Sequence, residues 1–250
     1  MVERRLQDGT AGRTNIIEGM TIPFGNPSPK STTLLMHFDG DLTDKTGLNT
    51  PAIYGTETYQ DGKFKNALKL NGSSCVKIPR SDAVVLGTSD FTIAGWFYWD
   101  GTTTGGSYPR FFSCQYRYSS SYAYQGIFCQ ITASTKSIDW KVATSYSSAA
   151  VDAATGQTAP VNEWFHLAIV RSGTTLTFYY NGTSKATGTI GATASVYQHS
   201  SASFKIGAGT NESSSNDTPI NFLSGAVDEF IIAKEAVWTS NFTPPDREYR

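Results

Sequence analysis

The sequence predicts an all-β protein: a two-sheet antiparallel β-sandwich with an extended N-terminal arm. After residue 33, about a dozen short runs are rich in β-branched and aromatic residues, and most end at Gly, Asn-Gly, Asp-Gly or Pro. No long stretch repeats its apolar positions with the 3.6-residue period of a helix. The length of 250 residues suits one sandwich domain plus a tail. We therefore expect an arm over residues 1–32 and one domain over residues 33–250.

The composition excludes several classes of protein. The 20 Lys and Arg residues nearly balance the 21 Asp and Glu residues, so no overall field attracts nucleic acid or an anionic membrane. An aromatic content of 13% with few charges excludes a wholly disordered chain. No run approaches the roughly 18 apolar residues of a membrane span, and the start lacks the apolar segment of a signal peptide. We expect cytoplasmic synthesis and neither a nucleic-acid nor a membrane partner.

The predicted arm differs in composition from the rest of the chain. It is basic near its start and ends in the proline-rich run TIPFGNPSPKS. Proline removes a backbone donor and biases the preceding residue toward extended geometry, which favours an extended segment. Because such a polar segment cannot bury a core of its own, we expect it to lie against a partner chain. The alternative is a frayed terminus. The expected anchoring residues are Arg4, Arg5, Arg13 and Phe24.

Two runs give the most specific expectations for the sheets. In the run 91–99 (FTIAGWFYW) both alternating faces are largely apolar, as is typical of a central strand covered on both sides. In the run 175–187 (TLTFYYNGTSKAT), Asn181-Gly182 supplies the positive φ values of a type I′ turn, so this run predicts a β-hairpin. Four tryptophans are expected in the core or on a sheet face: Trp96, Trp99, Trp140 and Trp238.

The three cysteines are too few, and odd in number, for a disulfide framework. Cys75, Cys114 and Cys129 each lie within an apolar, strand-like run. We therefore expect buried thiols. A bridge between Cys114 and Cys129 on neighbouring strands stays open as an alternative.

Six runs occur in an order that resembles a known domain family. They are LLMHFDGDLTDKTG, GKFKNALKLNG, DFTIAGWFYW, NEWFHLAIVRSGTTLTFYYNG, FKIGAG and FLSGAVDEFIIAKEAVWTSNFTPP. The set resembles the concanavalin-A-like, laminin-G-type jelly-roll domains over about residues 33–245. The ending FTPP is similar to copies of this domain in bacteriophage structural and tail proteins. The resemblance implies a jelly-roll sandwich.

From this resemblance we predict a non-enzymatic structural protein of a phage virion, either a capsid decoration or a tail or fibre component. It would be made in the host cytoplasm and dock on a capsid or tail protein through its arm. The displayed jelly roll would serve adhesion to glycans or to the host surface. The alternative from another class is a free, calcium-dependent carbohydrate-binding lectin module. A homo-oligomer is compatible with either function.

Many members of the resembled superfamily bind Ca²⁺ beside the first strand. Calcium takes about six to eight oxygen ligands, which carboxylates and carbonyls supply. Asp39 and Asp44 follow the predicted first strand, and Asp228 lies in the last, and these strands are close together in such a jelly roll. We expect these three carboxylates to converge. Otherwise, Asp39-Gly40 is a turn, and Asp228 or Glu229 hydrogen-bonds backbone near the sheet edge.

A glycan-cleaving enzyme is the least favoured function. Retaining glycosidases need two carboxylates about 5–5.5 Å apart, and the Glu-x-Asp-x-x-Glu motif of the laminarinase-type relatives is absent. Asp228 and Glu229 are adjacent, so on a regular strand they would point to opposite faces. We predict that the protein is not an enzyme.

A lectin needs exposed aromatic rings beside a few well-placed hydrogen-bonding groups. The Ser/Tyr-rich run 116–126 offers both, since tyrosine gives rigid contact area and serine adaptable hydrogen bonds. The predicted glycan-binding or partner-binding residues are Tyr118, Tyr122 and Tyr124. The alternative is that these rings cover a neighbouring subunit or pack on their own sheet.

Overall fold

The computed structural model describes residues 28–103, 106–115, 126–145, 148–210 and 217–250. Before them it gives the short antiparallel pair β1 (Ile16–Ile17) and β2 (Met20–Thr21). The anchoring residues predicted in the arm (Arg4, Arg5, Arg13 and Phe24) lie outside the described residues. In the described part of the chain no helix is long and apolar enough to cross a membrane.

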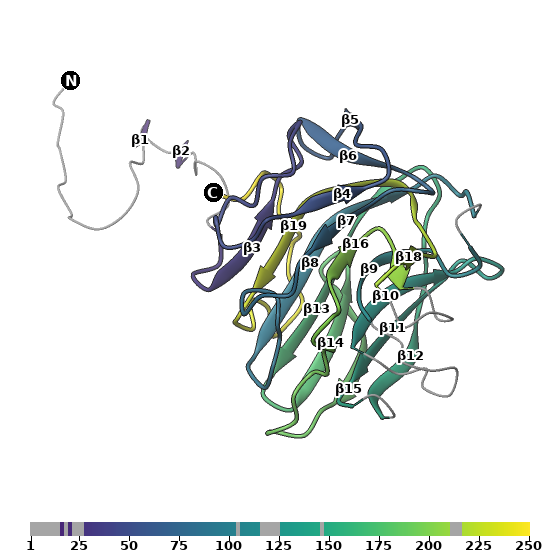
Figure 1. The fold of residues 1–250 in the computed structure, drawn as a ribbon. Coiled ribbons are helices and arrows are strands. Elements are labelled where there is room, and N and C mark those ends of the chain that lie inside the picture. The colour runs from purple at the N-terminus through teal and green to yellow at the C-terminus, as the bar shows by residue number, and fades with distance from the viewer. Residues whose placement is uncertain are drawn as a thin grey trace, which may run out of the picture.

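Two antiparallel sheets face each other, which confirms the predicted sandwich (Figure 1). The first sheet has seven strands, in the spatial order β12 (Ala149–Thr158), β11 (Ser137–Ala143), β10 (Ile127–Thr132), β9 (Arg110–Cys114), β16 (Phe204–Ile206), β7 (Cys75–Ile78) and β4 (Ala52–Tyr54). A short hairpin of β17 (Gly209–Thr210) and β18 (Pro219–Ile220) follows β16.

The second sheet has eight strands and contains both ends of the domain. Seven follow one another in the order β15 (Thr183–Thr189), β14 (Thr175–Tyr180), β13 (Trp164–Ser172), β8 (Phe91–Trp99), β19 (Ser224–Ala233), β6 (Asn66–Asn71) and β5 (Tyr59–Asp61). The eighth, β3 (Thr32–Met36), pairs with β19. The first and last strands of the domain are therefore neighbours, as the resemblance implied.

The core lies between the inner faces of the two sheets and is rich in aromatic rings. Phe97 of β8 lies 5.1 Å from Phe111 of β9, measured between ring centres, and Phe112 stacks on Phe204 at 6.0 Å. All four rings are at most 1% exposed. Each such ring contributes roughly 1.5–3 kcal/mol relative to an exposed ring. This aromatic layer holds the two sheets together.

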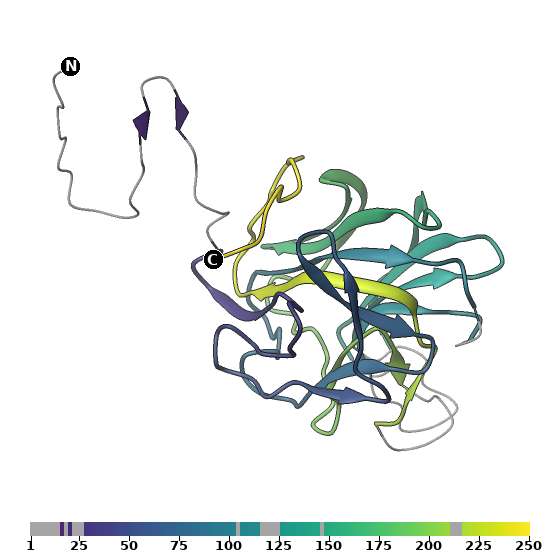
Figure 2. The same cartoon turned by 90° about the horizontal axis from the view of Figure 1, so that it is seen from above.

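The outer face of the eight-stranded sheet is also covered, here by the C-terminal segment (residues 234–250). Tyr249 packs with Leu35, Ala94 and Ile231 in a second apolar cluster on that face. In Figure 2 the C-terminal segment, in yellow, lies on the opposite side of the sandwich from the β17–β18 hairpin. The prediction that the run 91–99 is covered on both faces is thus confirmed.

The predicted hairpin turn is present. Tyr180 and Thr183 are cross-strand partners at the end of β14 and β15, and Asn181 and Gly182 between them have φ values of 46° and 74°. Both values lie in the left-handed region that a type I′ turn requires. The hairpin prediction is confirmed.

Strand β19 changes its neighbour halfway along its length. Its first half, to Val227, pairs with β6, and its second half, from Phe230, pairs with β3. The register against β8 shifts between Asp228 and Ile231, and Glu229 has a φ of 49°. A β-bulge therefore lies where β6 and β3 meet along one edge of β19.

All three cysteines are free, buried thiols. Burial raises the pKa of Cys75 and of Cys114 to about 12, which keeps both as unreactive thiols near neutral pH. The expectation of buried thiols is confirmed, and Cys114 and Cys129 form no bridge.

Candidate functional site

A row of outward-pointing side chains crosses the seven-stranded sheet. The cross-strand register joins Lys77 of β7 to Lys205 of β16, then to Ser113 of β9, Phe128 of β10 and Lys141 of β11. Because side chains alternate along a strand, partners across neighbouring strands share one face. These five residues, the polar row, therefore lie together on the outer face, opposite the core.

One half of the polar row is built around an aromatic ring. The guanidinium carbon of Arg110 lies 3.9 Å from the centre of the Phe128 ring, and Nζ of Lys141 lies 5.4 Å from it. Lys141 also forms a 2.8 Å ion pair with Asp152 of β12. Cations over an aromatic face are attracted by its quadrupole, more strongly where water is excluded. The arrangement holds two cations and a buried ring in fixed positions.

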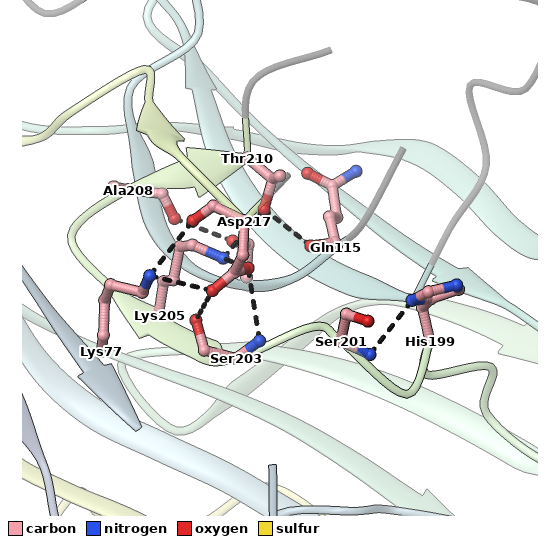
Figure 3. Close-up of polar contacts among 10 residues, drawn as sticks. Lys77, Gln115, His199, Ser201, Ser203, Lys205, Ala208, Thr210 and Asp217 are labelled. Carbon is pink, nitrogen blue, oxygen red and sulfur yellow. Dashed lines mark hydrogen bonds and ion pairs between the residues drawn. The ribbon is translucent and has the colours of Figure 1, made fainter. Parts of the chain in front are cut away.

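The other half contains a buried ion pair between Lys205 and Asp217 (Figure 3). Lys205 is fully buried, and its ammonium also donates to Oγ1 of Thr210 at 2.9 Å. Asp217 further accepts from Oγ of Ser203 at 2.5 Å and pairs with Lys77 at 3.0 Å. Asp217 therefore fixes the residues just before β18 to the outer face of the sheet.

The pKa values of this pair follow from burial and charge. Burial lowers the pKa of Lys205 below its usual value, and the charge of Asp217 offsets part of that effect. Burial alone would raise the pKa of Asp217. This effect is outweighed by the charge of Lys205 and by hydrogen bonds from Lys205, Ser203 and Lys77, so the pKa of Asp217 is lowered. The pair is thus held as an ammonium and a carboxylate.

The residue before the segment 116–125, which includes the predicted tyrosines, contacts the residue before the segment 211–216. Oγ1 of Thr210 donates to the carbonyl of Gln115 at 2.6 Å, while accepting from Lys205 (Figure 3). Gln115 immediately precedes residues 116–125, and Thr210 immediately precedes residues 211–216. Gln115 and Thr210 are therefore joined to each other, and through Thr210 to Lys205 of the polar row. The predicted binding residues (Tyr118, Tyr122 and Tyr124) lie in 116–125, outside the described residues.

The predicted calcium ligands do not come together as a set. The carboxylate of Asp44 accepts five hydrogen bonds within its own turn region, from Leu35, Thr46 and Asn49, at 2.7–3.0 Å. It is 5% exposed. Its oxygens organise the turn after β3.

Asp39 and Asp228 instead both face the turn between β5 and β6. Asp39 pairs with Lys65 at 2.9 Å, and Oδ2 of Asp228 accepts from the backbone N–H of Phe64 at 2.9 Å. The residues that the structure describes contain no group of three His, Cys, Asp or Glu side chains able to hold a metal ion. Calcium needs more oxygen ligands than any one of these carboxylates supplies, so the three do not fit a shared calcium ion.

The expectation that Asp228 and Glu229 point to opposite faces is wrong. Asp228 is the cross-strand partner of Trp96, and both side chains lie on the outer face of the eight-stranded sheet. The bulge turns Glu229 to that face too, where it accepts from the Tyr249 backbone N–H at 2.9 Å and lies 2.6 Å from Nδ1 of His37. Strict alternation holds only in a regular strand, and the bulge breaks it. Both carboxyls are at most 1% exposed.

Burial has a large effect on Asp228. It raises the pKa of this carboxyl to about 8. The hydrogen bond from Phe64 lowers the pKa in part, and the charges of Glu229 and Asp39 raise it further. The hydrogen bond to Glu229 raises the pKa of His37. On the outer face of the eight-stranded sheet, Asp228 is therefore mostly protonated near neutral pH.

The comparisons with known proteins agree with this fold. A family model described as the concanavalin A-like lectin/glucanases superfamily, of the laminin G type, matches residues 70–239. The chain belongs to this family. No curated protein matches the chain.

Solved structures of similar fold include sugar-related and toxin domains. Domain 4 of AbnA, an extracellular arabinanase from Geobacillus stearothermophilus solved with arabinotriose, has a TM-score of 0.60 at 24% identity, covering 83% of this chain and 94% of that one. The binding domain of Paraclostridial Mosquitocidal Protein 1 has a TM-score of 0.61 at 16% identity, covering 83% and 50%. The binding domain of botulinum neurotoxin DC, solved in complex with rat synaptotagmin II, has a TM-score of 0.61 at 13% identity. The match covers 83% of this chain and 49% of that one.

At these identities the similarity shows a shared concanavalin-A-like fold. The chain spans about half the length of the two toxin binding domains. The jelly-roll family predicted from the order of the six runs is confirmed.

Sequence reasoning about this concanavalin-A-like chain missed the polar row. Lys205 lies within the apolar run FKIGAG, and Asp217 is twelve residues further along. No spacing rule connects them, since their pairing depends on where β17 and β18 lie relative to β16. A lysine in the middle of an apolar strand was the one available signal, because such a residue is rarely buried without a partner.

Proposed function

We propose that the chain is a non-catalytic carbohydrate-binding module that binds its ligand on the outer face of the seven-stranded sheet. The observation that carries this proposal is the hydrogen bond between Thr210 and Gln115, which fixes the residue before the segment 116–125 next to Lys205 of the polar row. Sugar recognition requires aromatic surface next to fixed hydrogen-bonding groups. In this proposal the Ser/Tyr-rich run 116–126 supplies the first. Lys77, the one residue of the polar row that is not buried, supplies the second, and the buried residues of the row hold the face of the sheet in place.

The polar row is prearranged for this task. The Lys205–Asp217 pair and the cations on Phe128 are held by contacts within the protein. Groups fixed before binding lose little conformational entropy when a ligand arrives. The ligand class is supported by the family and by the arabinanase domain solved with arabinotriose.

The absence of catalysis is part of the proposal. Asp228 and Glu229 share a face, but Glu229 is buried and both of its carboxylate oxygens are already engaged, by Tyr249 and by His37. A retaining glycosidase needs a carboxylate pair open to the substrate. Incubation of the protein with candidate oligosaccharides should release no reducing ends, and sustained release would contradict this part.

The test of binding is a calorimetric titration with a panel of oligosaccharides that includes arabinotriose. Tyr122→Ala and Tyr124→Ala should weaken binding of the active sugar about tenfold or more, as expected for a lost stacking ring. Tyr108→Ala is the matched control, since Tyr108 is a 47% exposed tyrosine outside that loop. Binding that survives both loop changes, or no binding across the panel, would overturn the proposal. Repetition in EDTA tests the calcium-dependent alternative.

We further propose that the module is displayed on a phage virion, attached through the predicted arm (residues 1–32). The support is the similarity of the C-terminal run, ending in FTPP, to copies in bacteriophage structural and tail proteins. Mass spectrometry of purified particles should count this chain against the major shell protein. A stoichiometric count indicates a capsid decoration, and a few copies indicate the tail. Absence from the particles would contradict the virion setting and leave a free lectin.

A further inference from the structure

A second row of polar side chains crosses the other sheet, on the opposite side of the molecule. His166 of β13, Trp96 of β8 and Asp228 of β19 are cross-strand partners. They are 1%, 7% and 0% exposed. Neighbouring strands are about 4.8 Å apart, so the three span roughly 10 Å, about the width of one or two sugar rings.

Each of these side chains has a buried polar atom that has no hydrogen-bond partner among the described residues. The atoms are Nδ1 of His166, Nε1 of Trp96 and Oδ1 of Asp228. Buried polar groups in proteins are nearly always hydrogen-bonded, because leaving one without a partner is costly. Trp140 in the core also has an unpartnered indole N–H, so one such atom alone indicates nothing. Three on adjacent strands form a set.

The set lies beneath a removable cover. Nζ of Lys63 lies 4.2 Å above the centre of the Trp96 ring, and Lys63 is an exposed side chain on the turn between β5 and β6. Phe64 meets the same ring edge-on at 6.3 Å, while Trp238 and Phe242 each lie 5.8 Å from the ring of His166. A rotation of the Lys63 side chain would uncover one face of Trp96, with aromatic walls around it.

We propose that His166, Trp96 and Asp228 form a second binding site, which takes a neutral polyhydroxylated ring such as a monosaccharide in place of Lys63 over Trp96. The ring would stack on the indole, and its hydroxyls would pair with the three unpartnered atoms. The indole N–H donates only, whereas the imidazole nitrogen and the carboxyl oxygen donate or accept according to their protons. This mixture matches hydroxyls, which also do both.

The charge states of His166 and Asp228 favour an uncharged ligand. Burial lowers the pKa of His166 to about 3, so the imidazole is neutral. With its pKa raised to about 8, Asp228 is mostly protonated at pH 7. A row without net charge pairs poorly with a carboxylate or phosphate ligand. The site is independent of the polar row, because it lies on the other sheet.

The test follows the Trp96 indole N–H by ¹⁵N NMR during titration with glucose, galactose, arabinose and N-acetylglucosamine, with glucuronate as the charged comparison. A neutral sugar should shift the Trp96 resonance in a saturable way and leave that of Trp140 unchanged. Trp96→Phe keeps an aromatic ring but removes the N–H, and it should weaken binding about tenfold. Tyr122→Ala should not change this shift, which separates the two sites.

Lys63→Ala keeps the proposal testable if Trp96→Phe disturbs folding, because Lys63 is exposed. Removing the cover should tighten binding several-fold, while Lys45→Ala, on a different turn, should not. The proposal is overturned if no neutral sugar shifts the Trp96 resonance in the wild type or in Lys63→Ala. It is equally overturned if Trp96→Phe, folded by its melting curve, binds the sugar as tightly as the wild type.

Discussion

The backbone N–H of Tyr249 donates a 2.9 Å hydrogen bond to Oε2 of Glu229, twenty residues earlier in the chain. The other oxygen of the same carboxylate lies 2.6 Å from Nδ1 of His37, just after β3. Next to Tyr249, Arg250 accepts a 3.1 Å hydrogen bond from the backbone N–H of Ser28, where the predicted arm meets the domain. One buried carboxylate thus connects the central strand β19 to both ends of the domain.

Glu229→Ala should loosen the C-terminal segment. The change removes the acceptor for the Tyr249 N–H and the charged partner of His37, and hydrogen bonds to charged groups contribute about 1.5–3 kcal/mol each. Hydrogen exchange should show faster exchange of the Tyr249 amide. Asp246→Ala is the control in the same segment, since the Asp246 side chain is 69% exposed. Equal protection in the wild type and Glu229→Ala would contradict this role.

Asp228 should make the protein less stable as the pH rises through the neutral range. Its pKa is raised from 3.8 to about 8 in the fold, so between these values the native state holds a proton that the unfolded chain has lost. The contribution of Asp228 to the free energy of unfolding therefore falls between about pH 4 and pH 8. Above pH 8 this contribution no longer changes with pH. Asp228→Asn lacks this titration. In urea unfolding, its stability relative to the wild type should rise across that window, and parallel pH profiles would show the prediction to be wrong.

Asp217→Ala should be far more damaging than the loss of an exposed ion pair. It leaves the fully buried ammonium of Lys205 without a carboxylate, and breaking such a pair costs about 3–5 kcal/mol. The comparison is Asp41→Ala, which removes an ion pair with Lys45 whose side chains are 51% and 37% exposed, and it should cost at most about 1 kcal/mol. Chemical denaturation measures both. Adding Lys205→Met to Asp217→Ala should recover much of the lost stability. If the two single variants lose similar stability, that result would argue against a buried pair.

The sheets could be predicted because their signals are local. The double-faced apolar pattern of residues 91–99 and the positive φ values available to Asn181-Gly182 act within a few residues. The order of the six runs then gave the jelly-roll family, which the match over residues 70–239 confirms.

The sites could not be predicted in the same way, because they depend on neighbours that are distant in sequence. Asp228 and Glu229 share a face because β19 changes partner from β6 to β3 at that point. The polar row depends on the register of five strands, and the Lys205–Asp217 pair joins residues on either side of β17. Alternation and composition contain no information about such contacts.

Gly182 and Gly173 offer a test of how closely the C-terminal segment packs on the hairpins. Both have positive φ, at 74° and 60°. A β-carbon at Gly182 would lie 1.9 Å from the carbonyl oxygen of Phe242, whereas one at Gly173 would have nothing within 4 Å. The backbone N–H of Phe242 also donates to the carbonyl of Gly182 at 2.9 Å. The two positions therefore share the conformational penalty but not the collision.

Gly173→Ala should cost about 1–2 kcal/mol, the penalty of a left-handed residue with a side chain. Gly182→Ala should cost clearly more, because Phe242 must move away from the hairpin and from the ring of His166 that it contacts. Urea unfolding gives both costs, and hydrogen exchange at the Phe242 amide shows whether the segment has moved. If the two variants lose the same stability and Phe242 stays protected, the close approach at Gly182 does not constrain the segment.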